Sequence, residues 1–166
     1  TFIDIICQIY EKELKMRYSI VFLLFISSVL VAKPKFTDQQ IAGMTPKYFK
    51  RNHTAPKLKG LKIYKEGNER IYYIEIIADR NRSSEDLSFA VSALANMGQY
   101  AKKPFNKYVV VMHYNVRGKG VDICEANARC TADYMLRKQI TYDQWYKKCI
   151  TFTSTWEIRY KTIIHL

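Results

Sequence analysis

The chain has 166 residues and a net charge of +12, from 27 Lys and Arg against 15 Asp and Glu. Tyr and Phe are abundant while Gly and Pro are scarce, so the composition is suited to a packed core and excludes a disordered chain. The strongly basic balance favours anionic partners, although surface charge also serves solubility alone.

Residues 16–32 have the pattern of a secretory signal sequence. Lys15 and Arg17 supply the positive region, and an apolar run follows over residues 20–32. This run is shorter than the roughly 20 apolar residues that a spanning helix needs. We therefore predict a signal peptide, with the mature chain beginning near Lys33. The alternative is a membrane anchor with the domain outside the cytoplasm, because the positive residues stay inside.

Residues 1–15 are an unusually long front end for a signal sequence, and the chain starts at Thr1 rather than Met. Lys12 and Glu13 can be encoded as AAGGAG, a bacterial ribosome-binding sequence, just ahead of Met16. We therefore expect residues 1–15 to be an upstream extension and Met16 to be the start of a bacterial protein.

Residues 33–60 are predicted to form a basic, poorly structured arm. Proline interrupts the segment at three positions, and no apolar period is sustained along it. Positive charge dominates, with Asp38 as the single acid between Lys33 and Lys62. The remainder, residues 61–166, has the length of one domain, and we predict a single α+β domain.

The first elements of this domain are two strands and a helix. Strand patterns at 61–65 and 70–78 flank a turn containing Gly67 and predict a hairpin. Alternation along the second strand places a set of apolar side chains on one face, namely Tyr72, Ile74, Ile76 and Ala78. A helix is then predicted from Ser83 or Ser84 to about residue 101, where Lys102-Lys103-Pro104 ends it.

The second half begins with the strongest strand, at 107–117, whose central run is apolar on both faces and belongs inside a sheet. A helical pair is predicted next, at 125–138 and 141–149, with Thr141 as the cap of the second helix. The alternating tail at 152–164 predicts a last strand.

Together these elements give the order β-β-α-β-α-α-β. We expect a small antiparallel or mixed sheet with helices mainly on one face, preceded by the hydrophobic N-terminal helix and the basic arm. The crossover helix is expected to be right-handed. Whether the third strand pairs with the first or the second is left open.

Three cysteines follow the signal segment: Cys124, Cys130 and Cys149. In an antiparallel helix pair, Cys130 and Cys149 lie equally far from the turn, so we favour a disulfide between them in an oxidising compartment. Pairings of Cys124 with Cys149 or with Cys130 are the alternatives. All three thiols stay reduced if the protein is not exported.

The only catalytic arrangement that the residues suggest is His113 with Cys124 or Asp122, because a nucleophilic cysteine needs a base within reach. This would make the chain a small secreted hydrolase or a toxin-like effector. No motif predicts a metal site or a cofactor, since the histidines are scattered and no glycine-rich phosphate loop is present.

The basic arm carries the remaining functional signal. Its cations are predicted to bind anions, and they are interleaved with aromatic residues; the candidates are Lys47, Lys50, Arg51, Lys57 and Lys59. The preferred function is therefore an exported, non-catalytic binding or accessory protein of the periplasm or exterior. Its partner would be a protein or an anionic polymer, with membrane contact restricted to the N-terminal hydrophobic segment.

Overall fold

The structure is a computed structural model that describes residues 35–115 and 120–154. The predicted extension at 1–15, the signal segment at 16–32 and the end of the last predicted strand lie outside these residues. No helix within the described ranges has the length and apolarity to cross a membrane.

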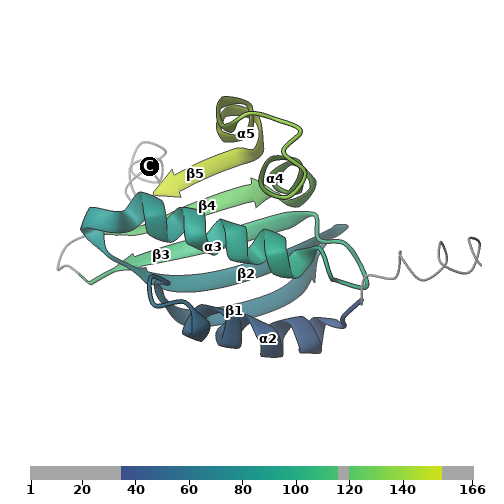
Figure 1. The fold of residues 1–166 in the computed structure, drawn as a ribbon, viewed down its shortest axis with the longest axis horizontal. Helices are drawn as coiled ribbons and strands as arrows, with labels where there is room; N and C mark the ends of the chain where they lie inside the picture. Colours follow the sequence, from purple (N-terminus) through teal and green to yellow (C-terminus); the bar gives the residue numbers. More distant parts are fainter. Residues whose placement is uncertain (1–34, 116–119, 155–166) are drawn as a thin grey trace, which may run out of the picture. The chain divides into compact units, whose positions relative to one another are not determined.

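The described chain forms a five-stranded mixed sheet with helices, so the predicted α+β class is confirmed (Figure 1). The strands lie side by side in chain order, and β2 pairs with β3 in parallel while the other neighbours are antiparallel. The strands are β1 (Lys57–Glu66), β2 (Glu69–Ala78), β3 (Lys107–Tyr114), β4 (Val121–Asn127) and β5 (Ile150–Ser154). The helices are α2 (Asp38–Arg51), the short 3-10 helix η1 (Arg80–Arg82), α3 (Ser83–Gly98), α4 (Ala128–Met135) and α5 (Tyr142–Cys149).

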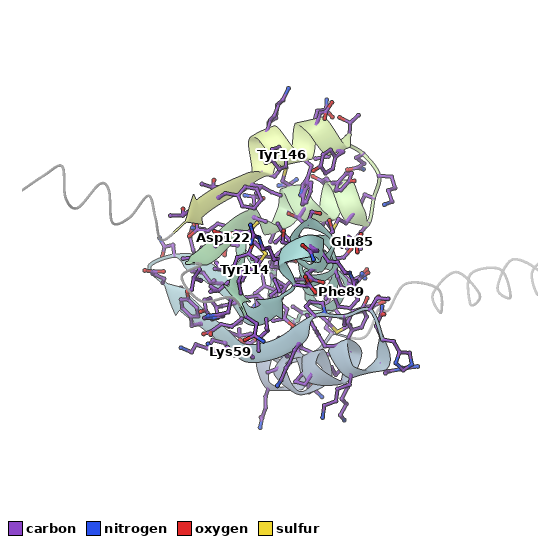
Figure 2. All side chains as sticks on the ribbon, turned by 90° about the vertical axis from the view of Figure 1, so that its left-hand side faces the viewer. Lys59, Glu85, Phe89, Tyr114, Asp122 and Tyr146 are labelled. Carbon is purple, nitrogen blue, oxygen red and sulfur yellow. A yellow bond between two sulfur atoms is a disulfide. The ribbon has the colours of Figure 1, made fainter. Side chains whose placement is uncertain are left out.

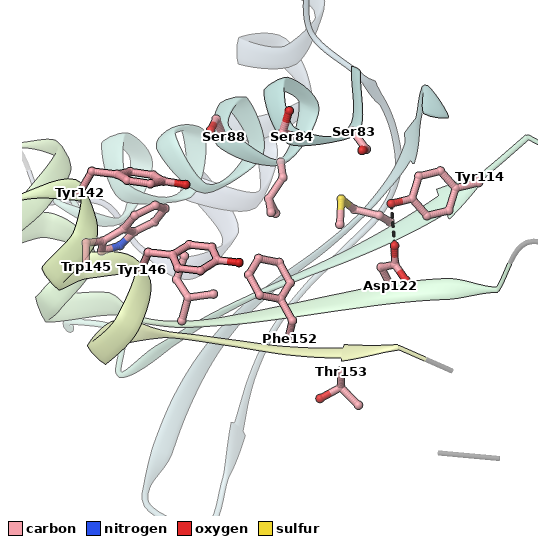
Figure 3. Close-up of a pocket in the computed structure, with 13 residues that line it drawn as sticks. Ser83, Ser84, Ser88, Tyr114, Asp122, Tyr142, Trp145, Tyr146, Phe152 and Thr153 are labelled. Atoms are coloured by element: carbon pink, nitrogen blue, oxygen red, sulfur yellow. Dashed lines mark hydrogen bonds between the residues drawn. The ribbon is translucent and has the colours of Figure 1, made fainter. Parts of the chain in front are cut away.

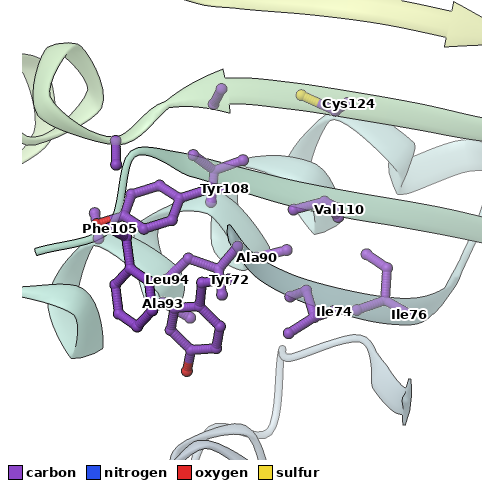
Figure 4. Close-up of a cluster of buried hydrophobic side chains, with 14 of the residues drawn as sticks. Tyr72, Ile74, Ile76, Ala90, Ala93, Leu94, Phe105, Tyr108, Val110 and Cys124 are labelled. Atoms are coloured by element: carbon purple, nitrogen blue, oxygen red, sulfur yellow. The ribbon is translucent and has the colours of Figure 1, made fainter. Parts of the chain in front are cut away.

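One face of the sheet carries the core, as the alternation along β2 predicts. Tyr72, Ile74 and Ile76 are fully buried on this face, and α3 lies across it (Figures 1 and 4). The same hydrophobic cluster includes residues of α2 and α5, represented by Phe49 and Trp145. The helices therefore share one apolar face of the sheet, which removes both their own apolar stripes and the strand side chains from water.

The β1–β2 hairpin turns at Gly67, whose φ of +54° is a left-handed conformation that suits glycine. After β2, helix α3 returns the chain so that β3 runs parallel to β2, with Ile74 opposite Val110. This settles the pairing that the sequence left open, because the third strand of the prediction lies beside the second. β3 is flanked on both sides, as its apolar run predicts.

Helix α2 is the first correction to the sequence prediction. Residues 38–51 are helical, whereas the segment was expected to be poorly structured. The buried positions are Ile41, Thr45 and Phe49, one per turn. Because the middle position is a polar threonine, the apolar residues alone do not show the spacing of a helix. A capping box formed by Thr37 and Gln40 fixes the start of the helix, and Pro46 lies inside it.

Strand β4 is the second correction. The prediction began a helix at Glu125, because several alanines follow and alanine favours helices. In the structure residues 121–127 alternate between the two faces of the sheet, with Cys124 and Ala126 buried on the core face. The helix begins only at Ala128, after Asn127 caps it through a hydrogen bond from the Cys130 amide.

The remaining helix boundaries follow the prediction more closely. Thr141 caps α5 in a capping box with Gln144, as expected for its cap position. The cap of α3 differs, because Ser83 is already helical and Arg82 at the cap position makes no side-chain cap hydrogen bond. Asp86 instead accepts a hydrogen bond from the Asp79 amide, which ties the chain ahead of α3 to the first turns of the helix.

Candidate binding sites

Three of the five anion-binding residues predicted from the sequence line one pocket where α2 meets β1. A pocket of about 590 Å³ opens between these elements, and Lys50, Lys57 and Lys59 line it. Its floor is apolar, with Phe49 and Leu58 among the lining residues. None of the described residues that line this basic pocket is acidic. The fold therefore places lysines of α2 and β1 along one concave surface.

The cations of this surface differ in their partners. Lys47, Lys50, Arg51 and Lys57 are exposed, and no carboxylate of the described residues pairs with them. Lys59 is different because its ammonium lies 3.8 Å from a carboxylate oxygen of Glu75. Four of the five candidates are therefore available to neutralise charge on a ligand without first breaking an ion pair.

His113 lies in a polar cluster on the sheet face away from the helices. Its Nε2 is 2.9 Å from Glu75 Oε2, and Lys59 Nζ is 3.4 Å from its Nδ1. The Tyr73 hydroxyl donates to the other Glu75 oxygen at 2.9 Å, and this bond is the largest cause that lowers the pKa of Glu75. The same Lys59 ammonium is 3.5 Å from Nε2, so it borders both ring nitrogens. These contacts give His113 a structural role in the sheet.

The structure does not bring His113 together with Cys124 or Asp122. In the antiparallel β3–β4 pair, His113 lies opposite Val121, whereas Cys124 lies opposite Val110. Directly opposite residues share a face and successive residues alternate, so His113 points to one face while Cys124 and Asp122 point to the other. Asp122 instead accepts a hydrogen bond from the Tyr114 hydroxyl at 2.7 Å.

Cys124 is predicted to be chemically inert in the folded protein. Its side chain is fully buried, and this burial raises the pKa of its thiol to about 12. We expect iodoacetamide at pH 8 to leave Cys124 unmodified until denaturant is added, with peptide mass mapping as the measurement. Rapid labelling of Cys124 without denaturant would contradict the buried position.

The structure joins Cys130 to Cys149 in a disulfide, the pair favoured by the sequence. The bond connects α4 to α5 across a sequence separation of 19 residues. A second contact lies beside it, where the Trp145 indole donates to the buried Thr131 hydroxyl at 3.2 Å. A disulfide suggests a location outside the cytoplasm, where thiols are not kept reduced.

Sequence reasoning missed a second concave site, formed by α3, α5 and the β3–β5 edge of the sheet. This aromatic groove has a volume of about 510 Å³ and shares no lining residue with the basic pocket. Figure 2 shows the separation, with Lys59 in the lower half of the side view and Tyr146 near its top. The available signal was the spacing of Tyr142, Trp145 and Tyr146, which places three aromatic side chains on one helical face.

Within the ranges that the structure describes, no group of three or more His, Cys, Asp or Glu side chains is placed to hold a metal ion. The chain matches no family model, no curated protein and no solved structure. The candidate sites therefore stand on their own geometry and chemistry.

Proposed function

We propose that this chain is an exported, non-catalytic binding protein whose basic pocket and neighbouring α2 cations bind an anionic polymer of the cell envelope or exterior. The observation that carries the proposal is that Lys50 and Lys57 line one pocket, beside Lys59, whose ammonium lies 3.8 Å from Glu75, and that no described lining residue is acidic. Lys47 and Arg51 extend the same charge along the exposed side of α2.

Export is supported by two independent features. The Cys130–Cys149 disulfide is typical of proteins in oxidising compartments. The pattern of residues 16–32 is typical of a signal peptide, and either cleavage or retention of that segment leaves the domain outside the cytoplasm. An acidic or phosphate-rich polymer is the class of ligand that such a basic exported domain would meet there.

A flexible polyanion fits this surface better than a small anion does. Four of the cations have no carboxylate partner among the described residues, and they are distributed along α2 and the start of β1 rather than focused on one point. A chain of negative charges can contact them in succession and release a counterion at each contact, which makes binding depend steeply on salt. The apolar floor of the pocket gives such a chain a boundary on which its uncharged parts can lie.

The proposal predicts salt-dependent binding to inorganic polyphosphate that depends on these particular lysines. The Lys50→Gln/Lys57→Gln variant is expected to bind at least about ten-fold more weakly than the wild type, with a shallower dependence of log K on log salt. Isothermal titration at several salt concentrations measures both quantities. Lys59 is left intact because its contact with Glu75 would mix a structural effect into the result.

The matched control is Lys102→Gln/Lys103→Gln, which removes the same charge from an exposed segment after α3. This variant is expected to retain near wild-type affinity. If both variants lost the same affinity for polyphosphate, net charge alone would explain binding, and the assigned site would be wrong. Wild-type binding that is indifferent to salt, or absent, would overturn the function itself.

A further inference from the structure

The aromatic groove is lined by large aromatic side chains that are exposed and therefore do not belong to the core. Of the four large hydrophobic side chains that are exposed among the described residues, three line it, namely Tyr142, Tyr146 and Phe152, at 54, 46 and 41% exposure. Burial drives such side chains inward, so their concentration at one hollow surface marks a binding site. Trp145, which is buried, forms part of the same wall.

The exposed rings form a row rather than a closed cage. The Tyr146 ring centroid is 5.8 Å from that of Tyr142, in a stacked arrangement, and 5.9 Å from that of Phe152. Figure 3 shows the α5 rings and Phe152 following one another along the groove toward Asp122. A row of this kind offers consecutive flat apolar platforms to an extended ligand.

Polar groups border the same row. Helix α3 presents the hydroxyl-bearing residues Ser83, Ser84 and Ser88 along one side of the groove (Figure 3). At its far end, Asp122 accepts the Tyr114 hydroxyl through Oδ2, and the described residues give its Oδ1 no hydrogen-bond partner. The groove therefore combines flat apolar rings with hydroxyls that donate and accept and with the Asp122 carboxylate, which accepts.

The charge of the groove separates it from the basic pocket. Asp122 is the one charged side chain among the described lining residues, so none of those residues offers a cation that could hold a phosphate or carboxylate. An anionic ligand would be repelled by the negative charge of Asp122 there. The groove therefore selects a ligand that is uncharged, has flat apolar faces and carries many hydroxyl groups.

We propose that the aromatic groove binds a neutral glycan chain. A pyranose ring presents a flat face of C–H groups that packs on aromatic side chains, while its hydroxyl rim donates to carboxylates and exchanges hydrogen bonds with serines. Successive sugars of one chain would lie on Tyr142, Tyr146 and Phe152. This assignment is independent of the polyanion proposal, because the two sites share no lining residue.

The test is a titration of the folded, disulfide-bonded protein with a panel of neutral oligosaccharides: oligomers of β-1,4-linked N-acetylglucosamine, of β-1,4-linked glucose and of α-1,4-linked glucose. At least one is expected to bind with an affinity that is unchanged by added salt. Tyr146→Ala and Phe152→Ala are each expected to raise Kd about ten-fold, and Asp122→Asn about three-fold or more. Isothermal titration provides the affinities.

The matched control is Tyr64→Ala, because Tyr64 is the remaining exposed large hydrophobic of the described residues, at 40% exposure, and lies on β1 outside the groove. It is expected to leave glycan affinity unchanged. Circular dichroism of each variant confirms that it is folded, so lost binding reports on the groove.

Three outcomes would overturn the glycan assignment. The first is that no oligosaccharide of the panel binds at millimolar concentration. The second is that cationic glucosamine oligomers bind and neutral ones do not, which would make the Asp122 charge the determinant. The third is that aromatic-rich peptides bind at the groove while glycans do not. Loss of polyphosphate binding by the lysine variants bears only on the other proposal, so the two can fail separately.

Discussion

Replacing Cys130 and Cys149 together by serine is expected to lower the free energy of unfolding by about 3 kcal/mol. The disulfide closes a loop across a sequence separation of 19 residues. Its removal raises the conformational entropy of the unfolded chain and so favours unfolding. Urea titration followed by circular dichroism measures the change as a shift of the midpoint. A reductant is expected to shift the wild type by the same amount and to leave the double variant unaffected.

The control for this experiment is Cys124→Ala, which removes a buried thiol without touching the disulfide. Its midpoint is expected to remain as sensitive to reductant as that of the wild type. If reductant does not move the wild-type midpoint, the disulfide does not stabilise the domain. Because the bond also holds α5, which carries Tyr142 and Tyr146, the double variant is expected to bind glycans more weakly even where it stays folded.

Sequence patterns predicted the elements in which the apolar residues recur with one clear period. Along β2, every second residue from Tyr72 to Ala78 is buried, and the hairpin turn requires a glycine at Gly67. The β3 run is apolar on both faces because it has a strand on each side. In these segments the local preference and the tertiary environment agree, so the sequence alone was sufficient.

The two elements that were missed are those in which the period is concealed. In α2 the buried stripe is one residue wide and includes Thr45, whose hydroxyl finds its partners only in the folded protein. In β4 an alternating pattern carries Asp122, Glu125 and Ala126, residue types that strands usually avoid. Tertiary packing outweighs propensity in both cases. The local signal for α2 was confined to its start, where Thr37 and Gln40 have the spacing of a capping box.

One of the two sites was likewise predicted from the sequence and the other was missed. The basic pocket was predicted as a charged run, since Lys50, Lys57 and Lys59 are near one another in sequence, although their convergence required the unexpected helix. The aromatic groove combines residues of α3, β3, β4, α5 and β5, so no window of sequence contains it. The pairing of His113 with Cys124 failed because one unrecognised strand places them on opposite faces of the sheet.

Tyr72 is expected to be the most sensitive single position for the basic pocket, because it connects β2 to α2. Its ring is fully buried, with the Phe105 centroid at 4.9 Å and that of Tyr108 at 6.2 Å. Thr45 donates its hydroxyl proton to the Ile41 carbonyl at 2.7 Å, so the hydrogen bond between Tyr72 and Thr45 must be donated by Tyr72. Burial raises the pKa of Tyr72 to about 12, so the hydroxyl stays a donor even in mildly alkaline solution.

Two substitutions separate the ring from the hydroxyl. Tyr72→Ala is expected to cost about 3–5 kcal/mol of unfolding free energy through the cavity it leaves, and Tyr72→Phe about 1 kcal/mol through the lost hydrogen bond. Urea titration measures both. If Tyr72→Phe unfolds at the wild-type midpoint, the hydroxyl contact does not hold α2. Because α2 supplies Lys50 while α5 and β5 supply the aromatic row, Tyr72→Phe is expected to weaken polyphosphate binding and to leave glycan binding unchanged.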